Sequence, residues 1–238
     1  MLRLHVDESL SPGLELDLPP APARHAQVRR VQPGDALVLF NGRGGEWQAR
    51  VTAMGRQSVR VQVLTHGMTD RELPLSVTLA VGMPANERMD WLVEKATELG
   101  ACALQPLHSE RSVLRLDAER AERKRDHWQA QGVAAAEQCG RTRVPQVLPV
   151  RRLGEWLAGP DLPAERWLLS PQAAHAPQRP LAGASVVVLS GPEGGLSAAE
   201  EAAALAAGFK AVHLGPRVLR AETAPLAVLA WLGLQLAG

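Results

Sequence analysis

The sequence predicts a two-part α/β protein, in which a small β domain precedes a larger domain built on a parallel sheet. Up to about residue 67, apolar and polar residues alternate in short runs separated by turn residues, which is typical of strands with one exposed face. From Pro74 onward, wholly apolar runs alternate with stretches of helical periodicity, as in a parallel sheet covered on both faces. This change of period places the domains at residues 1–72 and 73–238.

The elements follow in order along the chain. In the first domain, DALVLF (35–40), EWQARVTAM (46–54) and SVRVQVL (58–64) predict strands of a small barrel, with HGMTDREL (66–73) as the linker to the second domain. The second domain is expected to contain a strand at 76–82, a helix at 86–99, a strand at 101–107, a helix at 117–139, strands at 166–170 and 185–191, a helix capped by Ser197, a strand near 211 and an apolar C-terminal helix.

The composition indicates a globular protein of the cytoplasm. Of all residues, 46% are hydrophobic and 21% charged, and no run approaches the ~18 consecutive apolar residues of a membrane span. The N-terminus, MLRLHVDES, lacks the apolar core of a signal peptide. Neither the two cysteines, Cys102 and Cys139, nor the seven histidines have metal-ligand spacing, so we expect reduced thiols and no metal.

Positive charge is concentrated in the first domain. Between Leu18 and Gly67, seven arginines stand against two acids, Asp35 and Glu46, although the whole chain has a net charge of only +1. Planar guanidinium groups bind phosphate through paired hydrogen bonds, so this excess fits nucleic-acid binding. A genome biased toward arginine would produce the same excess, and charge alone leaves both interpretations open.

A glycine-rich segment, LSGPEGG (189–195), follows an apolar strand and precedes a helix that Ser197 can cap, with Glu200 three residues later. Parallel sheets bind ligands at such positions, beyond the carboxyl end of a strand. A phosphate loop would carry Gly-Lys-Ser/Thr, whereas this turn carries Glu193, which repels a polyphosphate. The segment favours a neutral or cationic adenosine compound such as S-adenosylmethionine. A turn merely shaped by glycines, with Glu193 in solvent, is the alternative.

A second loop precedes the apolar C-terminal helix, in AVHLGPRVLRAETAPLAVLAWLGLQL (211–236). Thr223 can cap this helix, and Pro225 suits its first turn. Because Arg217, Arg220 and Glu222 lie just ahead of an apolar helix, we expect them at the mouth of a site or at an interface.

GPEGGLS (191–197) and LGPRVLRAETA (214–224) together resemble the motif pair of the 16S rRNA (uracil-1498-N3)-methyltransferases, a family of the SPOUT superfamily of knotted methyltransferases. Further similar segments are EKATELGA (94–101), PLHSERSV (106–113), AAAEQCGRTRVPQV (134–147), RHAQVRRVQPGD (24–35) and NGRGGEW (41–47). The resemblance therefore covers nearly the whole chain in the expected order.

The resemblance implies a PUA-like β-barrel that positions rRNA, and an α/β domain with a deep trefoil knot, an exception to the rule against threaded chains. It implies a homodimer that uses S-adenosylmethionine to methylate N3 of a uridine in the 16S rRNA of the small ribosomal subunit. The implied cofactor-binding residues are Leu169, Ser190, Gly191, Pro192, Glu193, Gly194, Gly195, Leu214, Gly215, Leu219, Thr223 and Ala224.

For catalysis, Arg220 is expected to stabilise the uracil anion or a nearby phosphate, and Glu222 to act either as a base or as a structural partner of Arg220. The candidate RNA contacts are Arg24, His25, Arg29, Arg30, Arg111, Arg141 and Arg143. Each could instead be a solvated surface residue. Arg111 could also contact the other subunit, and Arg141 and Arg143 could simply end the long helix, where the helix dipole favours cations.

Two other functions compete with methyl transfer. A non-catalytic rRNA-binding or assembly protein could keep the same fold, although the intact GPEGG and LRAET segments argue against it. A nucleotide hydrolase would need a lysine in the glycine loop and a Walker acid, and the sequence shows neither.

Overall fold

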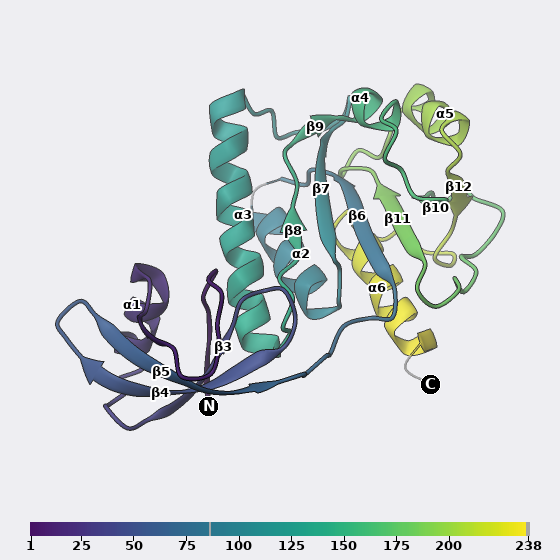
Figure 1. Cartoon of the computed structure of the whole chain (residues 1–238). Coiled ribbons are helices and arrows are strands. Elements are labelled where there is room, and N and C mark those ends of the chain that lie inside the picture. Colours follow the sequence, from purple (N-terminus) through teal and green to yellow (C-terminus); the bar gives the residue numbers. More distant parts are fainter. Residues whose placement is uncertain (86, 237–238) are drawn as a thin grey trace. The chain divides into compact units, whose positions relative to one another are not determined.

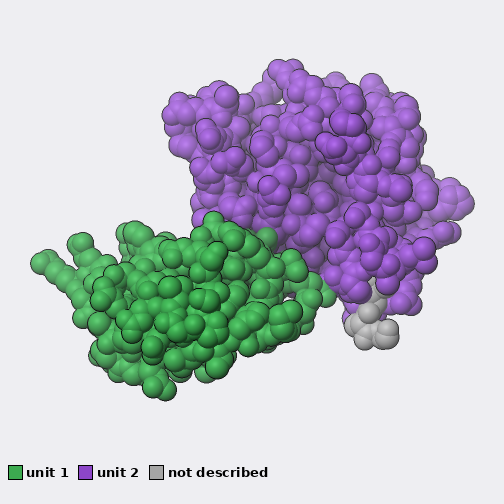
Figure 2. Space-filling model, viewed as in Figure 1, with its two compact units in different colours: residues 1–72, 136–144 green, residues 73–135, 145–238 purple. Residues whose placement is uncertain are grey.

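The computed structural model describes residues 1–85 and 87–236, which form two compact units (Figures 1 and 2). The first unit comprises residues 1–72 and 136–144, and the second comprises residues 73–135 and the chain from residue 145 onward. The division after Glu72 falls within the segment expected to be a linker. Helix α3 (Ala118–Cys139) contributes to both units, because its last four residues belong to the first.

The first unit is built on a five-stranded sheet with the strand order β1-β3-β4-β5-β2. Its strands are β1 (Leu2–His5), β2 (Glu15–Asp17), β3 (Ala36–Phe40), β4 (Glu46–Met54) and β5 (Val59–Gly67). β1 pairs in parallel with β3, and the other pairs are antiparallel. The three runs of alternating residues correspond to β3, β4 and β5, whereas β1 and β2 are too short for the alternation to predict them.

Alternation in the first unit separates core from solvent. In β5, Val59, Val61 and Val63 are fully buried, while Arg60 between them is exposed. Each buried valine contributes about 1.5–3 kcal/mol relative to an exposed one, which fixes the face that the strand turns inward.

Helix α1 (Pro20–Val28) is an element that the strand pattern did not predict. A proline occupies its first turn, where a missing N–H costs nothing. Its core contacts come from small residues, Ala23 and Ala26, and the helix packs against β1 and β5. A helix that buries alanines rather than large apolar side chains leaves little hydrophobic signal in the sequence.

The second unit contains an all-parallel sheet with the order β12-β10-β11-β6-β7-β8, and β9 also pairs with β7. Its strands are β6 (Ser76–Gly82), β7 (Ala103–His108), β8 (Gln146–Val147), β9 (Arg151–Arg152), β10 (Glu165–Leu169), β11 (Ser185–Ser190) and β12 (Lys210–Val212). Its helices are α2 (Glu87–Glu98), most of α3, α4 (Leu153–Leu157), α5 (Ala198–Ala206) and α6 (Thr223–Leu236). Asn86, where the first helix was expected to start, lies outside the described residues.

Both faces of this sheet are covered, as the apolar strands predict. Val186 and Val188 of β11 belong to a core shared with α2, α3 and α6. Val187 and Leu189 of the same strand belong to a second core shared with α4 and α5. None of the helices in the described part of the chain is long and apolar enough to cross a membrane.

The strand order decides where a site can form. β11 lies between β10 and β6, and β12 pairs with the other edge of β10, all running in the same direction. The loops that follow these four strands therefore meet at one edge of the sheet, although they are far apart in sequence.

Candidate active site

A cavity of about 530 Å³ opens at this carboxyl edge. The ends of β10 and β11, the glycine loop (residues 191–196) and the loop between β12 and α6 (residues 213–222, the Arg220 loop) line it. Small-molecule sites in proteins typically measure ~300–1,000 Å³, so the cavity can enclose a nucleoside-sized ligand. Of the twelve residues expected to hold the cofactor, all but Thr223 line this one cavity.

The glycine loop has a tight backbone conformation that larger residues could not adopt. The N–H of Gly195 donates to the carbonyl of Pro192 at 2.8 Å, and Gly195 has a φ of 68°. A Cβ on Gly191 would lie 2.7 Å from the backbone nitrogen of Leu196. The loop ends at α5, where Ser197 and Glu200 form the predicted capping box.

Glu193, the acid inside the glycine loop, is held by hydrogen bonds although the residue remains partly exposed. Its Oε1 accepts hydrogen bonds from the N–H of Ala85 at 3.0 Å and from Nη1 of Arg88 at 3.1 Å. Burial raises the pKa of the Glu193 carboxyl, but these bonds and the Arg88 charge outweigh that effect and hold the pKa below its usual range. The carboxylate therefore fastens the loop to the segment between β6 and α2.

Two further contacts hold the glycine loop. A Cβ on Gly82, the last residue of β6, would lie 2.7 Å from the nitrogen of Pro192, so only a glycine allows the strand to approach the loop this closely. On another side, Nη1 of Arg111 donates to the carbonyls of Gly194 at 2.9 Å and Leu196 at 3.3 Å. Arg111, a candidate RNA contact, thus supports the loop.

The Arg220 loop presents one charged side chain to the cavity and buries another. Arg220 lines the cavity and is exposed. Glu222 is only 8% exposed and does not line the cavity; its Oε1 lies 3.9 Å from Nε of Arg88, and its Oε2 has no hydrogen-bond partner within the described residues. In the described part of the chain, Glu222 pairs with Arg88 and forms no ion pair with Arg220.

Sequence reasoning missed several cavity residues, of which Arg88 is the most informative. It lies in the first turn of α2, the helix that follows β6. The rule that loops after parallel strands share an edge would have pointed to it, but the segment resembles no ligand motif by itself. Further lining residues outside the expected set are Ser170, Pro171, Leu196, Glu201, Val212, Val218 and Ala221, whereas Arg217 lines the cavity as a residue expected at the mouth of a site.

The candidate RNA contacts of the first unit have different surroundings. Arg24, Arg29 and Arg30 are exposed. His25 lies 3.1 Å from Glu137, measured from Nδ1 to Oε2. Arg143 is also exposed and faces Arg43 across an isolated antiparallel bridge.

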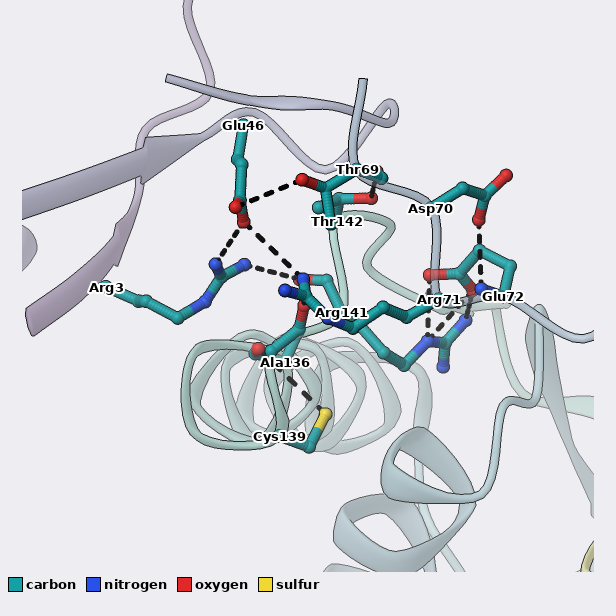
Figure 3. A network of polar contacts seen from close by, with 11 residues as sticks. Arg3, Glu46, Thr69, Asp70, Arg71, Glu72, Ala136, Cys139, Arg141 and Thr142 are labelled. Atoms are coloured by element: carbon teal, nitrogen blue, oxygen red, sulfur yellow. Dashed lines mark hydrogen bonds and ion pairs between the residues drawn. The ribbon is translucent and has the colours of Figure 1, made fainter. Parts of the chain in front are cut away.

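Arg141 is not placed to contact RNA, contrary to our expectation. It is 4% exposed, and its Nε donates to Oε2 of Glu72 at 2.9 Å (Figure 3). A buried guanidinium that is bound to a carboxylate has no surface left for a phosphate. Arg141 instead connects the end of α3 to the segment expected to be the linker, which up to Glu72 belongs to the first unit.

The same network includes Glu46, which accepts hydrogen bonds from Arg3 and, at 3.1 Å, from Oγ1 of Thr69 (Figure 3). Burial raises the pKa of the Glu46 carboxyl, but the hydrogen bond and charge of Arg3, with help from Thr69 and Arg71, hold the pKa below its usual range. Within the described residues, no group of three His, Cys, Asp or Glu side chains is arranged to hold a metal ion.

Comparison with known proteins agrees with this architecture. Residues 71–233 match the family model of an RNA methyltransferase domain, and residues 20–64 match that of an RNA methyltransferase PUA domain. The ribosomal RNA small subunit methyltransferase E of Bacillus subtilis is 32% identical, with the match covering 87% of this chain and 85% of the relative. The chain belongs to the methyltransferase E family. The Synechocystis enzyme of the same name is 36% identical over 86% of this chain and 67% of its own.

Two similar solved structures extend the match to the whole fold. The Neisseria gonorrhoeae enzyme bound to S-adenosyl methionine is 38% identical, with a TM-score of 0.91 over 99% of this chain and 98% of that one. A Legionella pneumophila methyltransferase in complex with the same cofactor is 31% identical, with a TM-score of 0.92 over 98% and 97%. The predicted fold class, a parallel-sheet methyltransferase domain after a PUA-like domain, is confirmed, while the trefoil knot stays a prediction.

Proposed function

We propose that this protein transfers a methyl group from S-adenosylmethionine to N3 of a uridine in the 16S rRNA of the small ribosomal subunit, the uridine numbered 1498 in the family's name. One observation carries the proposal: the two loops that resemble the family's motif pair line a single cavity at the carboxyl edge of the sheet, and Arg220 lines it too.

The cavity residues fit the cofactor. Leu169, Leu196 and Leu214 offer apolar surface for a purine ring. Ser190 also lines the cavity, and its buried Oγ has no partner among the described residues, which leaves it available to a ligand hydroxyl or amine. Because the glycines of this loop carry no side chains, the backbone N–H and C=O groups of the loop can contact the ligand directly. Bound there, S-adenosylmethionine would supply an electrophilic methyl group on a sulfonium.

The protein's own contribution is positioning and charge. Uracil N3 becomes nucleophilic when its imide proton passes to solvent, and the negative charge that remains spreads over the ring. Arg220, exposed at the cavity, is placed to stabilise that charge or the neighbouring phosphate. Holding acceptor and donor in line can supply about 7–11 kcal/mol of the barrier reduction. Glu222, which is buried and does not line the cavity, is assigned a structural role rather than that of a base.

The rRNA and a second copy of the chain are the proposed partners, and the cytoplasm is the proposed location. The exposed arginines of the first unit, Arg24, Arg29, Arg30 and Arg143, provide phosphate contacts. In the second unit, helix α6 is apolar on nearly all sides, yet Leu234 is 82% exposed. Trp91 of α2, which packs beside α6, is 45% exposed. Such a helix is normally buried, and we propose that the partner subunit covers it.

The decisive experiment measures transfer of labelled methyl from S-adenosylmethionine to small ribosomal subunits that lack the modification, with the product mapped by reverse transcription. Methylation at N3 blocks Watson–Crick pairing, so the expected result is a stop at the target uridine. Transfer to another nucleotide would refute the assigned position. Binding of rRNA without any methyl transfer or cofactor binding would favour a non-catalytic assembly protein.

A further inference from the structure

Arg88 contacts both loops of the cavity at once. Its Nη1 donates to Oε1 of Glu193 in the glycine loop at 3.1 Å, and its Nε lies 3.9 Å from Oε1 of Glu222 in the Arg220 loop. Different nitrogen atoms serve the two carboxylates, so a planar guanidinium can hold both simultaneously.

Among the residues that the structure describes, Arg88 alone forms ion pairs with both loops. In the part of the chain that the structure describes, no ion pair besides those of Arg88 joins the glycine loop or the Arg220 loop to the rest of the site. Arg111 reaches only the glycine loop, through the carbonyls of Gly194 and Leu196. Arg88 therefore links the position of one loop to that of the other, whereas Arg111 does not.

Burial makes the Arg88 contact with Glu222 more consequential than an ordinary surface ion pair. Exposed pairs contribute little because water replaces either partner. Glu222, however, is 8% exposed, and within the described part of the chain the half-exposed Arg88 is the one cation that forms an ion pair with its carboxylate. Removal of Arg88 would leave a buried charge without compensation, and the loop would move to hydrate it.

We propose that Arg88 is a positioning residue that locks the glycine loop and the Arg220 loop into one arrangement, so that the donor and the group that stabilises the acceptor are held in register. The proposal rests on the proposed function of the cavity, but the coupling of the loops is a property of the free protein. Arg88 acts through Glu193 and Glu222 and needs no contact with a substrate.

The first test is hydrogen exchange in the full-length protein without ligand. The reporters are the amide of Gly195, bonded to Pro192, and the amides of Thr223 and Ala224, both bonded to the carbonyl of Arg220. Arg88→Ala is expected to speed exchange about tenfold in both loops, because each loses a charged contact.

Two matched variants make this test specific. Arg111→Ala should speed exchange at Gly195 alone. Arg123→Ala, which removes an exposed pair with Glu119 on α3, should change neither loop. If Arg88→Ala affects only one loop, or neither, the coupling is refuted, whether or not the protein binds S-adenosylmethionine.

The second test separates positioning from simple stability. Arg88→Ala is expected to weaken S-adenosylmethionine binding about threefold to tenfold and to lower kcat as well, because both loops shift, and Arg88→Lys should recover part of each. Wild-type affinity and kcat in Arg88→Ala would overturn the proposal. Failure of the wild-type protein to bind the cofactor would instead count against the proposed function, and the exchange result would still decide the coupling.

Discussion

Substitution of Gly191 by alanine tests whether the crowded glycine loop is the cofactor site. The added methyl would lie 2.7 Å from the backbone nitrogen of Leu196 and 2.8 Å from the carbonyl carbon of Gly195. Both neighbours are backbone atoms, so no flexible side chain can move aside. The loop must open by about 0.7 Å, from 2.7 Å to the 3.4 Å at which ordinary contact begins.

The size of the effect follows from the cost of overpacking. Forcing an extra methyl into a packed site costs about 1–3 kcal/mol. If the loop opens in the free protein to avoid this steric cost, it must close again when the cofactor binds, and the binding free energy is then reduced by the same amount. Since 1.4 kcal/mol corresponds to a factor of ten, we expect affinity for S-adenosylmethionine to fall about 5-fold to 150-fold.

Calorimetric titration of Gly191→Ala with S-adenosylmethionine is the assay, with Gly154→Ala as the control. A Cβ on Gly154, in helix α4, meets nothing within 4 Å, so its affinity should equal that of the wild type. Thermal unfolding of both variants checks that each is folded. Wild-type affinity in a folded Gly191→Ala variant would show that the loop does not enclose the cofactor.

Four further predictions concern single side chains. Arg220→Ala should lower kcat at least about tenfold while the dissociation constant for S-adenosylmethionine stays within about twofold, as measured by methyl transfer and calorimetry, because it removes charge stabilisation specific to the transition state. The folded-state pKa of Glu46 is depressed, so its stabilisation is complete above the ordinary value of 4.5 and is lost as pH falls through the lower folded value. Glu46→Gln should therefore lower Tm at pH 7 and do so progressively less below pH 4.5. Arg141→Ala should destabilise the protein by about 3–5 kcal/mol in denaturant unfolding, because the largely buried Glu72 carboxylate is left unpaired. Leu234→Glu should shift the mass measured by light scattering from dimer to monomer, and an unchanged mass would exclude α6 from the interface.

The sequence predicted the second unit better than the first because its strands are continuous apolar runs. The side chains of Val186 to Leu189 are all buried, two on each face of the sheet. A strand with only apolar side chains must be covered on both faces to keep them from water. The capping box at Ser197 was equally legible, since its two hydrogen bonds involve residues three apart. Strands of two residues, such as β8 and β9, are too short to show a hydrophobic pattern, so the sequence did not predict them.

The sequence interpretation failed mainly to predict contacts between residues that lie far apart along the chain. Arg141 and Arg143 look alike in the sequence, yet one is buried against Glu72 and the other is exposed. That difference depends on a contact across 69 residues of chain, which no local pattern encodes. Arg88 was missed for the same reason, because its two carboxylate partners lie more than a hundred residues away.

The contacts that hold the glycine loop explain how so flexible a sequence could serve as the proposed cofactor site. Glycines lose more backbone freedom on ordering than other residues, so a free GPEGG segment would weaken binding by the entropy needed to fix it. Here the close approach of Gly82, the hydrogen bonds of Arg111 and the pairing of Glu193 with Arg88 hold the segment in the folded protein itself. Much of the ordering cost is thereby met during folding. The acid that excludes a phosphate loop is, in this structure, one of the groups that gives the loop its shape.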